Sequence, residues 1–207
     1  MAYKIISLEN IYEALGEERL KQQLNNFQCP MNKDVEFFIK EKAIQFFKAG
    51  IAKTFLVTTT YKNHNVIIGY FSLTSKVTRI RKNYLSTTLR KRISRFAEKS
   101  DINSYYTISL PLIGQLGKNY YNNYDKLIDG DTLLKLACDK VREAQDILGG
   151  KFVFLECEDK QRLKEFYESN GFVCFGKRNL EKDERDKNSG EYLLQMLCDL
   201  SKDYIHI

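Results

Sequence analysis

The sequence of 207 residues contains only two histidines, two prolines and no tryptophan. With only His64 and His206, it offers too little histidine for a histidine-based metal centre or a Ser-His-Asp triad. No apolar run approaches the ~20 residues that span a bilayer, and residues 1–18 turn acidic without the apolar centre of a signal peptide. We therefore expect no metal site, no contact with a membrane and a cytoplasmic location.

Cysteine is also sparse. The five cysteines are odd in number and show no CxxC spacing, which indicates reduced thiols in a cytosol rather than a disulfide framework. Cys138, Cys157 and Cys198 lie inside periodic apolar segments, so we expect them to pack in a core.

Apolar residues make up 43% of the chain and aromatic residues 13%, which is enough for a packed core. We predict a single α/β domain over residues 1–207. Strands over 53–61 and 66–74, joined by "KNHN", should form a hairpin. A strand–helix–strand order in the second half places a parallel strand pair at the centre of a mixed sheet. The other predicted elements are helices over 9–27, 34–48 and 160–170, strands over 105–117, 151–157, 171–177 and 191–200, and a helix from Gly130 to Leu148.

The entrance of that long helix is unusual, because Gly130 lies between Asp129 and Asp131. The free N–H groups and the positive dipole end of a helix N-terminus favour an anion. From the residues alone, this entrance is either an aspartate-capped helix or a degenerate phosphate-binding turn.

Residues 76–99 form a strongly basic connection with nine lysines or arginines and one acid, Glu98, in a chain of net charge +6. Such a stretch is either a solvated face or a surface that attracts a phosphate-rich partner such as tRNA. The cations that would hold an RNA backbone are Arg79, Arg81, Arg90, Lys91, Arg92 and Arg95.

Three stretches together resemble the C-terminal half of GNAT-type (Gcn5-related) N-acetyltransferases: "LIGQLGKNYY", "LIDGDTLLKLACDKVREAQ" and "FVFLECEDKQRLKEFYESNGFVCFGKR". The resemblance implies a mixed sheet with a splayed central parallel strand pair flanked by helices. Residues 1–50 would be the N-terminal helices, 53–117 the N-terminal strands with the basic connection, and 118–207 the acyl-CoA-binding and C-terminal half. The implied reaction is acetyl transfer from acetyl-CoA, as co-substrate, to a primary amine.

The same resemblance implies where acetyl-CoA would bind. Backbone groups of Leu116, Gly117 and Lys118 would face the pantetheine and the thioester, and the pyrophosphate would lie at the turn before the long helix. The turn departs from the family pattern, because Asp125 replaces its polar or basic first residue and Ile128 replaces its first glycine. The cofactor-binding residues implied in and beyond this turn are Asp125, Lys126, Ile128, Asp129, Gly130, Asp131 and Lys160.

Tyr167 matches the family tyrosine that acts as general acid. A phenol with a pKa near ~10 is protonated at neutral pH and can protonate the departing thiolate. The alternative is a packing residue of an amphipathic helix. Glu156 is the candidate general base, with Glu158 next along the same strand face; the alternative for each is a solvated strand-end acid.

The N-terminal stretch "FQCPMNKDVEFFIKEKAIQFFKAGIAKTFLVTT", which leads to "GYFSL", resembles the opening of GNAT toxins that acetylate aminoacyl-tRNA. The longer basic connection departs from those toxins. Three functions therefore stay open: an N-acetyltransferase of primary amines, a toxin-like acetyltransferase of aminoacyl-tRNA, and a GNAT-like module with a degraded cofactor loop that holds a nucleic acid or a protein.

Overall fold

The computed structural model describes residues 2–98, 104–181 and 190–201. The chain divides into two compact units: unit 1 takes Met1–Thr74 and Ile113–Ala137, and unit 2 takes Ser75–Leu112 and Cys138–Ile207. Three elements, β3 (His64–Arg81), β4 (Tyr105–Lys118) and α6 (Gly130–Leu148), begin in one unit and end in the other. Each unit is thus assembled from segments that are distant in sequence. One domain over residues 1–207 stays a prediction.

Unit 1 opens with a strand that the sequence analysis missed, β1 (Lys4–Ser7), followed by α1 (Leu8–Leu15) and α2 (Glu17–Asn25). The Ser7 side chain accepts a hydrogen bond from the Asn10 amide at 3.1 Å and so caps α1. The predicted single helix over 9–27 is wrong, because Gly16 adopts a φ of 77° that favours glycine and separates α1 from α2.

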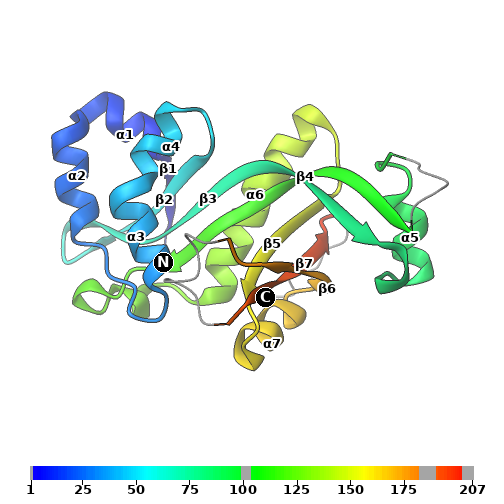
Figure 1. Ribbon diagram of the computed structural model, residues 1–207. Coiled ribbons are helices and arrows are strands. Elements are labelled where there is room, and N and C mark those ends of the chain that lie inside the picture. Colours follow the sequence, from blue (N-terminus) through cyan, green and yellow to red (C-terminus); the bar gives the residue numbers. More distant parts are fainter. Residues whose placement is uncertain (1, 99–103, 182–189, 202–207) are drawn as a thin grey trace. The chain divides into compact units, whose positions relative to one another are not determined.

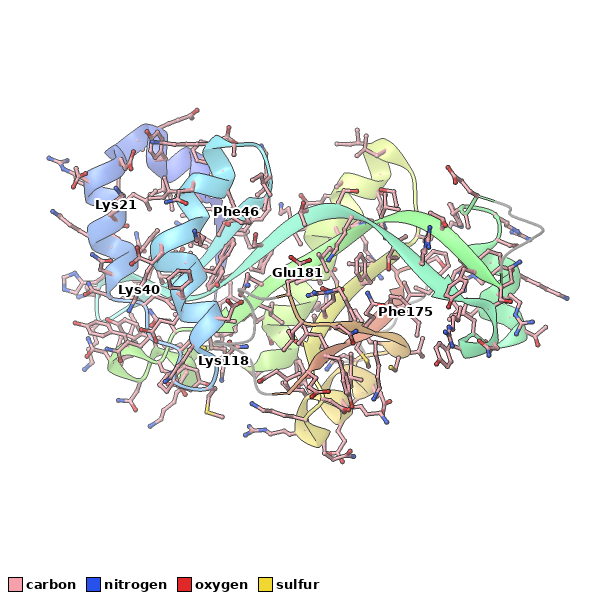
Figure 2. The ribbon with its side chains drawn as sticks, viewed as in Figure 1. Lys21, Lys40, Phe46, Lys118, Phe175 and Glu181 are labelled. Atoms are coloured by element: carbon pink, nitrogen blue, oxygen red, sulfur yellow. The ribbon has the colours of Figure 1, made fainter. Side chains whose placement is uncertain are left out.

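The predicted helix over 34–48 is confirmed as one continuous helical segment. It comprises α3 (Lys33–Phe37), a π-helical stretch η1 (Phe38–Lys42) and α4 (Ala43–Lys48). Figure 1 shows α1 and α4 against β2. Side chains one helical turn apart form ion pairs on these helices. Lys21 pairs with Glu17 at 2.8 Å and Lys40 pairs with Glu36 at 2.7 Å. Both lysines are labelled in Figure 2.

The predicted hairpin is confirmed. Strand β2 (Lys53–Tyr61) pairs antiparallel with β3, and Tyr61 lies opposite His64. The turn consists of Lys62 and Asn63, whose φ angles of 48° and 65° suit the two-residue turns that match the twist of paired strands. Against this hairpin the unit builds its core, which includes Leu20, Leu24, Phe27, Ile39, Leu56 and Tyr70.

The prediction that residues 76–99 form a connection is wrong in part, because most of the described residues in this range form regular secondary structure. Strand β3 continues to Arg81, a 3₁₀ turn η2 (Lys82–Tyr84) follows, and α5 spans Thr87–Ile93. In the strand, buried Thr78 and Ile80 alternate with exposed Val77, Arg79 and Arg81. This period of two is typical of a half-buried strand, but the density of charge obscured it.

Unit 2 also contains β5 (Phe152–Glu158), α7 (Gln161–Ser169), β6 (Val173–Asn179) and β7 (Tyr192–Asp199). Strand β7 pairs antiparallel with both β5 and β6, so the last strand lies between the two before it. The unit has its own core, which includes Ile80, Ile93, Leu110, Phe152, Phe154 and Phe175.

Along the sheet, the hydrogen-bonded order is β1-β2-β3-β4-β5-β7-β6, with β4 and β5 parallel and the other described pairs antiparallel. This confirms the predicted α/β class with a mixed sheet and a central parallel pair. Cys138, Cys157 and Cys198 are buried, as expected. None of the described helices combines the length and the apolar character that a bilayer span needs.

Candidate functional sites

The strand end predicted to face pantetheine lies in unit 1 and is tightly packed. A side chain added at Gly117 would place its Cβ 2.3 Å from Val35 Cγ1 of α3. Only glycine therefore lets α3 approach β4 this closely. Leu116 is half-buried, and the Lys118 ammonium donates to the Asp125 carbonyl at 2.9 Å. The strand end and the following turn are thus tied together by a direct hydrogen bond.

The turn before α6 is built around an aspartate cap. The Asp129 carboxylate accepts a hydrogen bond from the Thr132 amide at 2.6 Å. The backbone and side-chain hydrogen bonds from Thr132 lower the pKa of Asp129 below its ordinary value. Ile128 is buried with 3% of its surface exposed, so it anchors the turn where a glycine would leave space. Of the two possibilities that the residues left open, the described geometry is that of an aspartate-capped helix.

This cap bears on how well the turn fits the pyrophosphate of acetyl-CoA. An amide that already binds a carboxylate has no hydrogen left for a phosphate oxygen. Asp129 and Asp131 are both exposed, and they add negative charge at the helix end. Exposed Lys126 and half-buried Lys118 are the cations at hand. The Thr132 amide is therefore open to a pyrophosphate only after Asp129 has released it.

Tyr167 lies on α7 in unit 2. Its ring packs edge-on against Phe166, with centroids 5.0 Å apart, and against Phe172, at 5.9 Å. Desolvation, and then the neighbouring Cys157 and Cys138, raise the pKa of the Tyr167 phenol well above its ordinary value. The side chain is half-buried. It is therefore a packing residue and also a phenol that keeps its proton at neutral pH.

Glu156 is not the solvated strand-end acid that the alternative interpretation expected. Its side chain is 9% exposed and both carboxylate oxygens are engaged. Oε2 accepts from Arg178 Nε at 2.8 Å and lies 3.5 Å from the Lys76 ammonium, while Oε1 accepts from Gln195 Nε2 at 2.9 Å. This network joins β3, β5, β6 and β7 within unit 2.

Glu158 is likewise buried, with 8% of its surface exposed. The exposed Lys160 pairs with it at 2.7 Å between Nζ and Oε2. Lys160, predicted to contact the cofactor, thus has an acidic partner two residues away.

The basic side chains of 76–98 have different environments. Arg92 of α5 pairs with Asp199 of β7 and contacts Ser201, so its charge is used within unit 2. Arg90 is half-buried and donates to the Leu85 carbonyl at 3.4 Å. By contrast, Arg79 and Arg81 are exposed on β3 and line a pocket of about 660 Å³.

Several solved structures share this architecture. The structure of AtaT complexed with acetyl-methionyl-tRNAfMet has a TM-score of 0.61 at 16% identity, covering 93% of this chain and 94% of that chain. A tyrosine-to-phenylalanine mutant of KacT has 0.61 at 15%, covering 94% of each chain. AtaTR bound with acetyl-CoA has 0.56 at 14%, covering 96% and 94%. No protein-family profile and no curated protein matches the sequence.

The chain has the GNAT fold.

Within this GNAT fold, the predicted site residues divide between the two units. Unit 1 holds the proposed cofactor residues from Leu116 to Asp131, and unit 2 holds Tyr167, Glu156 and Lys160. In unit 1 the structure brings Lys118 to Asp125, and in unit 2 it pairs Lys160 with Glu158. The assignment of these residues to cofactor and catalysis stays a prediction.

The sequence analysis missed two cations of β6. Lys177 and Arg178 line the same pocket as Arg79 and Arg81. The stretch "GKR" at 176–178 ends the third of the stretches that resemble GNAT acetyltransferases, and the sequence analysis gave its cations no role. Its basic pair carried a signal, but only the folded chain brings the pair to the same pocket as residues about one hundred positions earlier.

Proposed function

We propose that the protein is an acetyl-CoA-dependent N-acetyltransferase that acts on the amino group of an aminoacyl-tRNA. The observation that supports this most is the match of the fold over nearly the whole chain to AtaT, whose structures include complexes with acetyl-methionyl-tRNAfMet and with acetyl-CoA. KacT gives a match of the same quality. Because the identity is 14–16%, the chemistry has to be argued from this chain's own residues.

In the proposed reaction, the acceptor amine attacks the thioester carbonyl carbon and the carbon–sulfur bond breaks. Acetyl-CoA supplies the activated acetyl group, and its sulfur leaves as a thiolate that needs a proton. Tyr167 is the proposed donor of that proton. Its raised pKa keeps the phenol protonated at neutral pH, and a positioned general acid typically contributes ~10²–10⁴ in rate.

The amine must also lose a proton, and Glu156 is the proposed acceptor. Its two hydrogen bonds, from Arg178 and Gln195, hold the carboxylate in one orientation. The contact to Lys76, at 3.5 Å, is the longest of the three. Movement of Lys76 would free a lone pair of Oε2 for the amine proton or for a bridging water.

The cofactor would lie along the backbone of Leu116, Gly117 and Lys118, with its pyrophosphate at the turn that ends in Asp131. Lys118, Lys126 and Lys160 are the cations proposed to balance the phosphates. The Asp129 cap favours a second candidate function, a GNAT-like module that holds a partner without using acetyl-CoA, because the cap already occupies one amide of the cradle.

A binding and transfer experiment separates these functions. A ligand that binds only the folded protein stabilises it by ~2.7 kcal/mol at a hundredfold excess over its Kd. Acetyl-CoA should therefore raise the melting temperature of the parent. Gly130→Glu, which adds bulk and charge at the cradle, should abolish the rise.

Transfer is then followed with acetyl-labelled acetyl-CoA and three acceptors: charged tRNA, uncharged tRNA and simple amines. Label on charged tRNA alone is the expected result. Label on simple amines alone would replace the tRNA acceptor with a small one. A folded parent that shows no thermal shift at millimolar acetyl-CoA would favour the binding module.

A further inference from the structure

Unit 2 contains a pocket of about 660 Å³ that none of the proposed catalytic or cofactor residues lines. Its walls come from the second half of β3, from the start of β4, from β6 and from Gln195 of β7. Five cationic side chains line it and no acidic residue does, among the residues that the structure describes. The five are Lys76, Arg79, Arg81, Lys177 and Arg178.

Two of these cations leave much of their binding capacity free. Arg79 has no ion pair or hydrogen bond with any described residue. Arg81 meets only neutral groups: its Nε donates to the Tyr105 hydroxyl at 2.6 Å, and its guanidinium lies 5.4 Å from the Tyr105 ring centroid and 5.9 Å from that of Tyr84. The two rings hold the guanidinium in place without neutralising it.

The opposite wall is shaped by an irregularity in β6. The register of β6 against β7 shifts between Cys174 and Gly176. A Cβ at Gly176 would lie 3.1 Å from the Gln195 side-chain oxygen, so the wall carries no side chain at this point. Phe175, labelled in Figure 2, is buried in the core of unit 2. A bulge of this kind re-aims the neighbouring side chains, here Lys177 and Arg178, both of which line the pocket.

The rim provides a surface for a flat ring. Tyr84 is 55% exposed and Val77 is 64% exposed, and both line the pocket. Proteins that hold single-stranded nucleic acid combine a cationic groove for phosphates with exposed aromatic rings on which bases stack. Here Tyr84 and the two arginines without an acidic partner, Arg79 and Arg81, belong to one short stretch of chain, Val77–Tyr84.

We propose that this pocket binds an unpaired nucleotide of the RNA acceptor, with its phosphates on Arg79 and Arg81 and its base against Tyr84. The proposal deepens the proposed function, on which it rests for the identity of the RNA. Unit 2 carries two further exposed cations outside the pocket, Lys91 and Arg95. Several exposed cations beyond the two arginines of the pocket suit a polynucleotide better than a free mononucleotide.

The test measures binding of a fluorescently labelled, single-stranded oligoribonucleotide to the full chain by anisotropy over a series of salt concentrations. Each lost phosphate contact should lower the slope of log affinity against log salt by ~0.7. Arg79→Gln should therefore weaken binding and flatten the slope by about that amount. Lys151→Gln is the control, since it removes one exposed positive charge of the same unit outside the pocket.

Tyr84 is tested separately from charge. Tyr84→Ala should weaken binding about tenfold, as the loss of one stacked base does, whereas Tyr84→Phe keeps the ring and should bind like the parent. Melting curves check that each variant is folded. Tyr84→Ala also removes a ring that contacts Arg81. If the variant changes the position of Arg81, Arg79→Gln still tests the phosphate contact independently.

Three results would overturn the proposal. Parent-like affinity and salt slope in both Arg79→Gln and Tyr84→Ala would show that RNA does not bind in the pocket. An equal loss of RNA affinity in Lys151→Gln would show that the effect of Arg79→Gln comes from the net charge of the protein and not from the pocket. Displacement of the oligonucleotide by adenosine monophosphate at a similar concentration would assign the pocket to a mononucleotide.

The two proposals fail in different ways. If pocket variants bind RNA weakly but the parent acetylates no charged tRNA, the proposed function fails and the pocket stands. If the parent acetylates charged tRNA and the variants bind RNA unchanged, the pocket proposal fails alone.

Discussion

The turn Asp125–Asp131 of unit 1 and the pocket of unit 2 both carry groups that attract phosphate, and they differ in what those groups already bind. At the turn, Asp129 takes the Thr132 amide and the Asp125 carbonyl takes the Lys118 ammonium. In the pocket, Arg79 has no partner among the described residues and Arg81 is held by neutral rings. The first region satisfies its own donors. In the second, Lys76 and Arg178 pair with Glu156 and Lys177 pairs with Asp159, while Arg79 and Arg81 have no acidic partner among the described residues.

The comparison shows that a donor provides binding capacity only when no internal acceptor has taken it. A hydrogen bond to a charged group is worth about 1.5–3 kcal/mol. A ligand that must displace such a bond therefore loses that amount of binding free energy. A phosphate that binds the Thr132 amide has to displace a carboxylate, and a phosphate that binds Arg79 or Arg81 does not. The sequence motif pointed to the turn, whereas the open capacity lies in the pocket.

The largest expected effect tests whether unit 2 also carries the chemistry. Tyr167→Phe keeps the ring contacts to Phe166 and Phe172 but removes the proposed acid. Acetyl transfer should fall by ~10²–10⁴, while the thermal shift with acetyl-CoA stays close to that of the parent. The measurement is single-turnover transfer with acetyl-labelled acetyl-CoA. Turnover near the parent rate in the variant would remove Tyr167 from the mechanism.

The next effect tests the packing that shapes the cofactor strand of unit 1. Gly117→Ala should lower the free energy of unfolding by up to about 3 kcal/mol, because its Cβ would overlap Val35. Gly114→Ala is the matched control on the same strand, where the nearest atom, the Ser72 carbonyl oxygen, is 4.0 Å away. Denaturant unfolding measures both. Equal stability of the two variants would contradict the close approach of α3 to β4.

A smaller expected effect distinguishes Arg92 of unit 2, which forms an ion pair with Asp199, from the exposed Lys91. Arg92→Gln leaves Asp199, whose side chain is 11% exposed, without its arginine. Unfolding should become about 2 kcal/mol easier, less than for a fully buried pair because Arg92 is partly exposed. Lys91→Gln, on the exposed face of the same helix, should change stability by less than about 0.5 kcal/mol. A comparable loss in both variants would mean that the Arg92–Asp199 pair does not stabilise α5.

The contribution of the Asp129 cap to the stability of the folded state should decrease at acidic pH. The pKa of Asp129 is lowered by its hydrogen bonds to Thr132, so the carboxylate stabilises the folded state above its ordinary pKa of 3.8. That contribution, about 1 kcal/mol for a helix N-cap, is lost as the pH falls through the lower pKa of the folded state. Thermal melts from pH 5 downwards should show a smaller decline for Asp129→Asn than for the parent. Parallel declines would show that the cap does not contribute.

The smallest effect concerns the affinity for acetyl-CoA. Asp129→Ser keeps a capping oxygen but removes the negative charge from the helix end. Charges at a helix terminus are worth about 0.3–1 kcal/mol, so the affinity should rise about threefold. Titration calorimetry with acetyl-CoA measures it. If the affinity falls instead, Asp129 assists the cofactor and the contrast between the two regions disappears.

The sequence alone determined the elements whose signal is local. Apolar periodicity predicted the second helical segment, the hairpin, the α6 helix and the buried strand β5, because amphipathic spacing depends only on a residue's near neighbours. Gly16 shows the limit of that signal. A glycine inside an apolar pattern leaves the pattern unchanged, and the backbone conformation that splits the helix is fixed only in the folded chain.

Only the tertiary structure decided which polar groups are free. Arg79 and Arg92 belong to the same basic stretch, yet Arg92 meets Asp199, 107 residues later in the chain, whereas Arg79 meets no acid among the described residues. Glu156 looked like a strand-end acid until strand pairing brought Arg178 and Gln195 to it. A charge acquires its role from the partners that folding places within hydrogen-bond distance, and those partners come from strands that sequence spacing does not pair.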